Sequence, residues 1–176
     1  MKFTALDLPG TFLVDLEPIT DNRGHFARTF CHDEFREHGL DPMVAQCNVS
    51  WNHRKGTLRG MHYQSDPHGE AKLVRCTRGA IFDVLIDLRP ESTAYCTWTA
   101  HELTADGPHM LFAPTGVAHG FLTLADATEV HYQMSAPYVQ DAASGVRWDD
   151  PAFAIDWPAA IEVISERDAG YPDFRP

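Results

Sequence analysis

Two short segments rich in glycine each carry a histidine that could take part in proton transfer. Residues 56–64 read GTLRGMHYQ and contain His62, and residues 114–120 read PTGVAHG and contain His119. A histidine that faces a pocket is either a hydrogen-bonded core residue or an acid–base catalyst. The two segments alone leave both interpretations open.

The neighbours of these histidines favour the catalytic interpretation. Arg59 stands three residues before His62, Lys72 stands ten residues after it, and Tyr132 lies on an otherwise apolar strand face. Long cations and a phenol in a protein interior are costly unless a ligand or partner satisfies them. Together they suit proton abstraction next to a carbonyl, in which histidine takes the proton, lysine stabilises the enolate and tyrosine returns a proton. The plain alternatives are a surface lysine and a core tyrosine.

The elements that must position these residues are predominantly β-strands. Residues 81–88 alternate, with apolar side chains on one face and Asp83 and Asp87 on the other. Residues 128–135 alternate in the same way and place Tyr132 on the apolar face. This period of two residues is typical of strands, and short strands between turn signals predict an all-β sandwich or barrel such as a jelly roll.

Helical periodicity is scarce. One short helix is predicted over residues 33–38, with Asp33 as its N-cap and Gly39 at its end. No repeat, linker or low-complexity segment divides the chain, so residues 1–176 are predicted to form a single domain.

The charge of the chain restricts its partners. The formal net charge is −11, from 25 acids and 14 bases. Residues 21–79 hold nine bases against seven acids, whereas residues 90–176 hold three bases against thirteen acids. The negative balance excludes nucleic acid and other extended polyanions, but it does not exclude a small anionic ligand held in a pocket.

Compartment and redox state follow from what the sequence lacks. The first residues do not form the apolar stretch of a signal peptide, and no stretch approaches eighteen apolar residues. The cysteines Cys31, Cys47, Cys76 and Cys96 show no C-x-x-C spacing, which is typical of reduced thiols rather than a disulfide framework. We therefore expect a cytoplasmic protein without a membrane partner.

The two histidine segments together resemble the signature motifs of the cupin superfamily of β-barrels, G-x5-H-x-H and P-x-G-x-x-H. In metal-binding cupins these histidines and a later glutamate hold a divalent ion. Here Gln64 replaces the second histidine of the first motif, and Glu70 stands one residue beyond the usual spacing. An amide is a poor substitute for imidazole on a transition metal, so we expect a cupin-like jelly roll with few short helices, no metal and no cofactor.

Seven motifs, including the two histidine segments, occur in the order of one cupin family. These are D-x-RG-x-F from Asp21, Q-x-N-x-S from Gln46, G-x-LRG-x-HYQ from Gly56, KLVR from Lys72 with Arg78 and Gly79 after it, P-x-G-x-AHGF from Pro114, G-x-RW-x-DP from Gly145, and SERD from Ser165. In this order they resemble the dTDP-4-dehydrorhamnose 3,5-epimerase family over about residues 4–168. The resemblance implies an isomerase of deoxysugar biosynthesis that acts on a nucleotide-linked 4-keto-6-deoxyhexose.

The resemblance also implies roles for four catalytic residues. His62 would remove protons from carbons 3 and 5 of the sugar, and Asp168 would pair with His62 and raise its basicity. Lys72 would stabilise the enolate at carbon 4, and Tyr132 would donate a proton from the opposite face. Without the SERD match, Asp168 would be read as a solvated carboxylate.

The substrate-binding residues carried over from the family are Arg23, Phe26, Arg28, Gln46, Asn48, Arg59, His119, Tyr138 and Arg167. Among them, Arg23, Arg59 and Arg167 would hold the diphosphate and Tyr138 would stack on the nucleobase. Gln46, Asn48 and His119 would complete the contacts. Family members are typically homodimers, so the resemblance implies a homodimer here.

The sequence departs from the family at two positions. Arg28 and Ala143 occupy positions where the family commonly has carboxylates on the nucleotide side of the site. The nucleotide of the substrate, whether dTDP, CDP or GDP, therefore stays open. Whether carbon 3, carbon 5 or both are inverted also stays open.

Three other interpretations come from different classes of protein. The first is a metal-dependent cupin enzyme, such as a dioxygenase or isomerase that uses His62 and His119. The second is a non-catalytic sugar-binding cupin, and the third is a structural barrel like those of seed-storage proteins.

Overall fold

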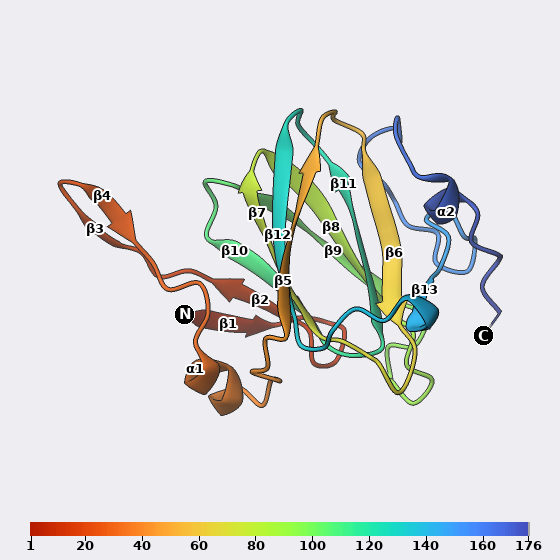
Figure 1. The fold of residues 1–176 in the computed structure, drawn as a ribbon, viewed down its shortest axis with the longest axis horizontal. Coiled ribbons are helices and arrows are strands. Elements are labelled where there is room, and N and C mark those ends of the chain that lie inside the picture. Colours follow the sequence, from red (N-terminus) through yellow and green to blue (C-terminus); the bar gives the residue numbers. More distant parts are fainter. Residues whose placement is uncertain (176) are drawn as a thin grey trace.

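Two antiparallel β-sheets face each other in the computed structural model, which describes residues 1–175 (Figure 1). The six-stranded sheet has the order β1 (Lys2–Ala5), β2 (Phe12–Asp15), β10 (His109–Ala113), β7 (Lys72–Arg78), β12 (Thr128–Met134) and β5 (Gln46–Asn52). The five-stranded sheet has the order β13 (Ala143–Gly145), β6 (Leu58–Gln64), β11 (Val117–Thr123), β8 (Ala80–Asp87) and β9 (Trp98–Thr104). The cupin-like jelly roll predicted from the sequence is confirmed.

The main core lies between the two sheets and follows from the alternation of the strands. Ile81 and Leu85 of β8, Phe121 of β11 and Val74 of β7 are all buried in one cluster, against which Tyr132 packs. The predicted strands at residues 81–88 and 128–135 are found as β8 and β12. The inward face of each sheet therefore supplies both the core and the pocket described below.

A second core covers the outer face of the five-stranded sheet. Val84 and Ile86 of β8 pack in one cluster with Phe153, and Trp157 and Phe174 lie against it. The C-terminal segment thus covers the apolar face of β8, so both faces of that strand are buried. The polar face of β8 points to the interior, where Asp83 and Asp87 are fully buried.

The structure corrects the predicted start of the short helix. Helix α1 spans His32–Glu37, and its N-cap is Cys31, which makes no side-chain capping hydrogen bond. Asp33 lies in the first turn instead, where a carboxylate interacts favourably with the positive end of the helix dipole. Gly39 follows the helix with a φ of +71°, a left-handed conformation that suits glycine.

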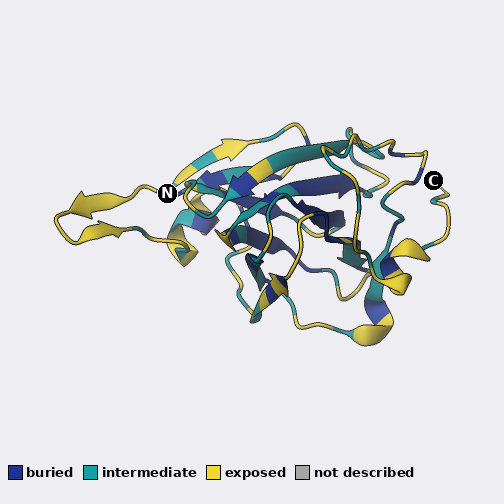
Figure 2. Cartoon of the chain, turned by 90° about the horizontal axis from the view of Figure 1, so that it is seen from above, coloured by how far each residue is buried: buried dark blue, intermediate teal, exposed yellow. Residues whose placement is uncertain are grey.

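A hairpin of β3 (Ile19–Asp21) and β4 (Gly24–Phe26) extends away from the two sheets (Figure 1, Figure 2). Every residue of both strands is exposed, and Ile19 and Phe26 each keep 71% of their surface accessible. Such exposure of large apolar side chains marks an interaction surface rather than a stable free hairpin.

Close contact between β6 and β11 depends on glycine. A Cβ atom on Gly60 would lie 2.5 Å from the Cα atom of Gly120, closer than real contacts allow. This approach places His62 of β6 directly opposite His119 of β11 in the strand register. The remaining elements are the 3₁₀ helix η1 (Gln140–Ala142) and helix α2 (Glu166–Ala169). Within residues 1–175, no helix is long and apolar enough to cross a membrane.

Candidate active site

A cavity of about 220 Å³ lies between the inward faces of the two sheets. It is lined by eight of the thirteen residues proposed from the sequence: Asn48, Arg59, His62, Lys72, His119, Tyr132, Tyr138 and Arg167. Residues that are 119 positions apart in the chain therefore meet in one pocket. Ala143, at one of the positions that depart from the family pattern, also lines it.

His62 and Asp168 form a hydrogen-bonded pair at the edge of this pocket. The distance from His62 Nε2 to Asp168 Oδ1 is 2.7 Å, while Asp168 Oδ2 accepts the Gly60 N–H at 3.2 Å. Asp168 sits in α2, which is held in place because the Ser165 side chain accepts the Asp168 N–H at 3.0 Å. The Asp168 side chain is 7% exposed and that of His62 is 40% exposed. The pair therefore joins a buried carboxylate to an imidazole that a ligand can reach.

The environment of Asp168 keeps its carboxylate ionised. Burial raises the pKa of Asp168, but hydrogen bonds from His62, Gly60 and Ser165 outweigh burial and hold that pKa below its ordinary value of 3.8. A charged carboxylate fixes the orientation of the His62 ring and stabilises the imidazolium that forms when His62 takes a proton.

Asp168→Asn is expected to remove a contribution to stability that depends on pH. Because the pKa of Asp168 is lowered in the folded protein, its contribution is present above pH 3.8 and is lost as pH falls through the lower, folded-state pKa. The difference in unfolding free energy between wild type and variant should therefore shrink below about pH 4. Urea denaturation over a pH series measures it, with Asp156→Asn as a solvent-exposed control. A difference that stays constant to the lowest pH would contradict this account.

Lys72 is buried in the pocket wall rather than on the surface. Its Nζ lies 3.0 Å from Glu70 Oε1 and donates to the carbonyl oxygen of His62 at 3.1 Å. An ammonium group has three donors, so one N–H stays available for a ligand in the pocket. The surface interpretation of Lys72 is therefore wrong, and Glu70 is the ion-pair partner that positions it.

Tyr132 approaches the pocket from the sheet opposite to His62. It lies on β12 of the six-stranded sheet, whereas His62 lies on β6 of the five-stranded sheet. Burial raises the pKa of Tyr132, and the Arg59 charge opposes this only in part. The phenol is therefore protonated at neutral pH and can act as a proton donor.

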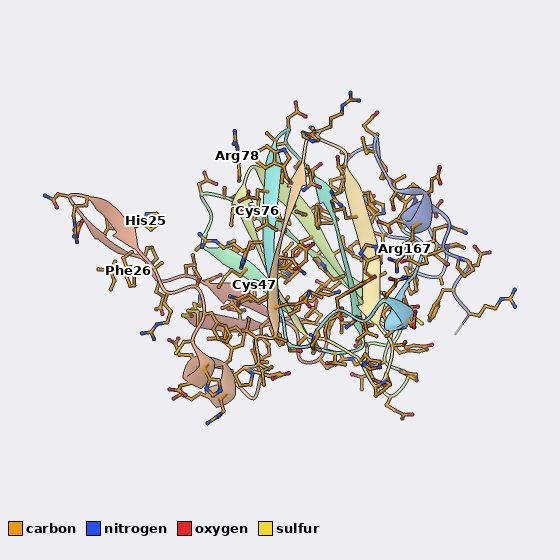
Figure 3. All side chains as sticks on the ribbon, viewed as in Figure 1. His25, Phe26, Cys47, Cys76, Arg78 and Arg167 are labelled. Atoms are coloured by element: carbon orange, nitrogen blue, oxygen red, sulfur yellow. The ribbon has the colours of Figure 1, made fainter. Side chains whose placement is uncertain are left out.

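Cationic and aromatic groups surround the rest of the pocket. Arg59 Nε donates to Asn52 Oδ1 at 2.7 Å, and Arg167 donates to the Ala143 carbonyl at 3.2 Å. Hydrogen bonding with Tyr138 raises the pKa of Arg167, which lies beside β6 in Figure 3. Gln46 does not line the cavity, but its Oε1 accepts the Tyr138 N–H at 2.8 Å. These contacts fix a positive, partly aromatic wall suited to a phosphorylated ligand.

Three residues proposed for substrate binding lie outside the pocket of their own chain. Arg23 and Phe26 are on the projecting hairpin, where Arg23 pairs with Asp21 (Figure 3 labels Phe26). Arg28 follows the hairpin and pairs with Glu34 at 2.7 Å. None of the three is among the residues that line the cavity of this chain.

Two neighbours of the histidines were not identified from the sequence. His119 Nε2 lies 2.6 Å from Asp83 Oδ1, and Asp83 is fully buried. The ring of Tyr171 packs edge-on against His62 with ring centres 6.3 Å apart. The available signal for Asp83 was its position on the polar face of a strand otherwise made of apolar residues. No such signal was available for Tyr171, because it lies in a C-terminal segment without the alternation of a strand.

Gln64, which replaces a cupin histidine, has a structural role. Its side-chain nitrogen donates to the carbonyls of His68 and Pro137 at 2.9 and 3.2 Å, and its oxygen accepts the Val139 N–H at 2.6 Å. Gln64 therefore ties the loop before η1 to β6. Across the described residues, no three His, Cys, Asp or Glu side chains gather in a way that could hold a metal ion.

A cupin-like barrel with a histidine–carboxylate pair, a buried lysine and a half-buried tyrosine in one pocket defines an acid–base enzyme. Comparison with known proteins identifies the family. A sequence profile described as dTDP-4-dehydrorhamnose 3,5-epimerase matches residues 5–176. The dTDP-4-dehydrorhamnose 3,5-epimerase of Sinorhizobium fredii is 40% identical over 175 residues, which cover 99% of this chain and 90% of that protein. The corresponding enzyme of Methanothermobacter thermautotrophicus is 41% identical, covering 99% and 95%.

The fold agrees with this assignment. The crystal structure of dTDP-4-dehydrorhamnose 3,5-epimerase from Elizabethkingia anophelis has a TM-score of 0.95 to this structure at 32% identity, covering 99% of this chain and 96% of that one. The chain belongs to the dTDP-4-dehydrorhamnose 3,5-epimerase family, as the sequence motifs predicted.

Proposed function

We propose that the protein epimerises carbon 3, carbon 5 or both of a nucleotide-linked 4-keto-6-deoxyhexose. The first candidate reaction converts dTDP-4-dehydro-6-deoxy-D-glucose to dTDP-4-dehydro-L-rhamnose. The observation that carries this proposal is the single pocket in which the His62–Asp168 pair meets Lys72 and Tyr132. A binding protein has no need of a base and an acid on opposite sides of its ligand.

The proposed roles follow from where each group lies. His62 takes the proton from the carbon next to the ketone, and the electron pair of that C–H bond becomes the enolate. The Lys72 ammonium stabilises the negative charge on the enolate oxygen. Such an interaction contributes about 3 kcal/mol in a preorganised site. Tyr132 then gives its proton to the opposite face of the same carbon, which inverts it.

The remaining pocket residues suit the nucleotide diphosphate. Arg59 and Arg167 are proposed to hold the phosphates, and Tyr138, which is 52% exposed at the pocket mouth, to stack on the base. A Legionella pneumophila 3,5-epimerase that is 28% identical was solved with dTDP-4-keto-L-rhamnose, which supports this substrate class. Asn48 and His119 face the same cavity and are proposed to contact the sugar.

Inversion at one carbon is the second candidate function. A 3'-monoepimerase from Streptomyces bikiniensis, solved with dTDP-quinovose, is 32% identical to this chain with a TM-score of 0.88. The same barrel therefore serves single and double inversion among relatives, which keeps 3-only and 5-only epimerisation as alternatives.

The deciding experiment is proton exchange in deuterium oxide, followed by NMR. dTDP-, CDP- and GDP-linked 4-keto-6-deoxyhexoses are each incubated with the protein, and deuterium at carbons 3 and 5 is measured. Deuterium at either carbon is expected, and the carbon labelled distinguishes double from single epimerisation. Absence of exchange with all three nucleotides would overturn the proposal.

We also propose a homodimer in which each hairpin completes the pocket of the partner subunit. The exposed β3–β4 hairpin carries Arg23 and Phe26, two proposed substrate-binding residues that their own pocket lacks. A guanidinium and an aromatic ring on an extended arm suit a diphosphate and a base in a neighbouring site.

Three expectations from the sequence remain predictions. They are a single domain over residues 1–176, a cytoplasmic location, and the absence of nucleic-acid or membrane partners.

Mixing two inactive variants tests the proposed homodimer. Arg23→Ala should lower kcat/KM by about 10- to 100-fold, because a charge-assisted hydrogen bond to phosphate is lost. When Arg23→Ala and His62→Asn chains are refolded together, half of the dimers are mixed, and each contains one intact site. Recovery of about a quarter of wild-type activity is expected. If each hairpin served its own pocket, every site would stay defective and mixing would restore nothing.

A further inference from the structure

The buried carboxylate of Asp83, behind His119, has a hydrogen-bond partner on only one of its two oxygens. Asp83 of β8 is fully buried, and its Oδ1 atom lies 2.6 Å from His119 Nε2. Its other oxygen, Oδ2, is buried and has no hydrogen-bond partner among residues 1–175. An ionised carboxylate with a free oxygen in a protein interior costs several kcal/mol unless a donor reaches it, so Asp83 needs a second partner.

His101 of β9 stands where that partner is needed. The register of β8 and β9 places His101 directly opposite Asp83, and directly opposed residues present their side chains to the same face of a sheet. The Nε2 atom of His101 is itself buried and lacks a hydrogen-bond partner within the described chain. An unpaired acceptor on Asp83 therefore faces a residue with an unpaired nitrogen.

The surroundings of His101 decide its protonation state, and therefore whether it meets Asp83 as a neutral donor or as a cation. Burial lowers the pKa of His101, and His109 of β10 lowers it further, while Asp83 and Asp7, which lies between β1 and β2, oppose this. His101 is therefore neutral at pH 7, with one N–H donor and one acceptor. Cys76 of β7 also faces Asp83, and burial raises the pKa of its thiol to about 11, so that group adds no charge.

We propose that His101 is a positioning residue for His119, and that its Nε2–H donates to Asp83 Oδ2 in a buried chain His119–Asp83–His101. A small rotation of the His101 ring or one buried water closes the contact. The second hydrogen bond fixes the Asp83 side chain and aims its Oδ1 at His119. His119 then presents to the pocket a ring of fixed orientation.

This inference rests on the proposed function only for its effect on turnover. The effect on His119 exists in the protein without substrate and is measured there. Failure of the epimerase proposal would leave the His119 measurement intact, and failure of the His101 proposal would leave exchange at carbons 3 and 5 unaffected.

The experiment compares His101→Leu, His101→Gln and the control Glu102→Gln by NMR of the His119 imidazole at one fixed pH. Leucine removes the donor, whereas glutamine keeps an N–H near the same place, and Glu102 lies next to His101 on the opposite face of β9. Loss of the donor leaves the Asp83 carboxylate free to rotate, so that Oδ1 no longer holds the His119 ring in one orientation. The Nε2 proton of His119, which faces Asp83 Oδ1 at 2.6 Å, should move upfield or broaden in His101→Leu and stay near wild type in the other two. With substrate, kcat should fall about tenfold in His101→Leu with KM little changed, and recover in His101→Gln.

The opposite results are equally clear. An unchanged His119 Nε2 proton signal in folded His101→Leu overturns the proposal, because Asp83 would then hold His119 without a second donor. If His101→Leu fails to fold, the tautomer of His101 in the wild-type protein decides by nitrogen chemical shifts. A proton on Nε2 supports the chain, and a proton on Nδ1 alone overturns it.

Discussion

His62→Asn is expected to lower epimerisation and deuterium exchange together by about 10²- to 10⁴-fold. Both processes begin with removal of a proton from the carbon next to the ketone, and His62 is the pocket base paired with a buried carboxylate, 2.7 Å from Asp168 Oδ1. Asparagine has nearly the same width and keeps a hydrogen bond to Asp168, but it cannot accept the proton. Exchange at carbons 3 and 5 and product formation are followed in the same NMR sample.

The fold of His62→Asn should be unaffected, because the side chain is 40% exposed and its neighbour Asp168 keeps a donor. His53→Asn, which changes an exposed histidine outside the pocket, is the matched control and should keep wild-type exchange. Equal exchange in His62→Asn and wild type would assign proton removal to another group, and the pocket offers only His119 as a second imidazole among its described lining residues.

Two of the strands were predictable individually because each carries its own alternation of apolar and polar residues. Residues 81–88 and 128–135 alternate over their whole length and are found as β8 and β12. The two histidines were predictable as a pair because each sits in a glycine-containing segment, and Gly60 and Gly120 are what let β6 and β11 approach. Local sequence thus indicated these two strands and the two histidines, whereas the other pocket residues came from the resemblance to the family.

Pairings between distant elements were not predictable. The register that sets Asp83 opposite His101, and the hydrogen bond from Asp83 to His119, depend on how three strands align, which no short window contains. The burial of Lys72 was expected, but its partner was not: the ion pair between Lys72 and Glu70 does not follow from their spacing of two residues. Alternation could not show that the C-terminal segment covers the outer face of β8.

The hairpin shows a different limit. The sequence indicates a turn at residues 21–24, and the structure has a hairpin there, but nothing local says that it leaves the barrel. Its side chains are not buried by the rest of the described chain, since every residue of β3 and β4 is exposed. Residues such as Arg23 can therefore be recognised by motif and still lie far from the pocket of their own chain.

Tyr132→Phe is expected to separate exchange from inversion. His62 still removes the proton and can return a deuteron to the same face, so exchange with retention should persist. Inversion needs a donor on the opposite face, and Tyr132 lies on the opposite sheet, so inversion should fall by about 10²- to 10⁴-fold. The ratio of deuterium incorporation to formation of the inverted sugar, measured in one NMR time course, should therefore rise sharply.

The pKa of Tyr132 gives the same prediction a pH dependence. Burial raises this pKa above its ordinary value of 10.0, so the phenol keeps its proton throughout the neutral and mildly alkaline range. Loss of inversion from deprotonation of Tyr132 should begin only above about pH 10 in the wild type and should be absent from the residual activity of Tyr132→Phe. Tyr95→Phe, outside the pocket, is the control and should leave both rates unchanged. A small and equal fall in exchange and inversion would instead give Tyr132 a binding role. A proton donor on one face of the sugar should slow inversion far more than it slows exchange by His62 on the other face.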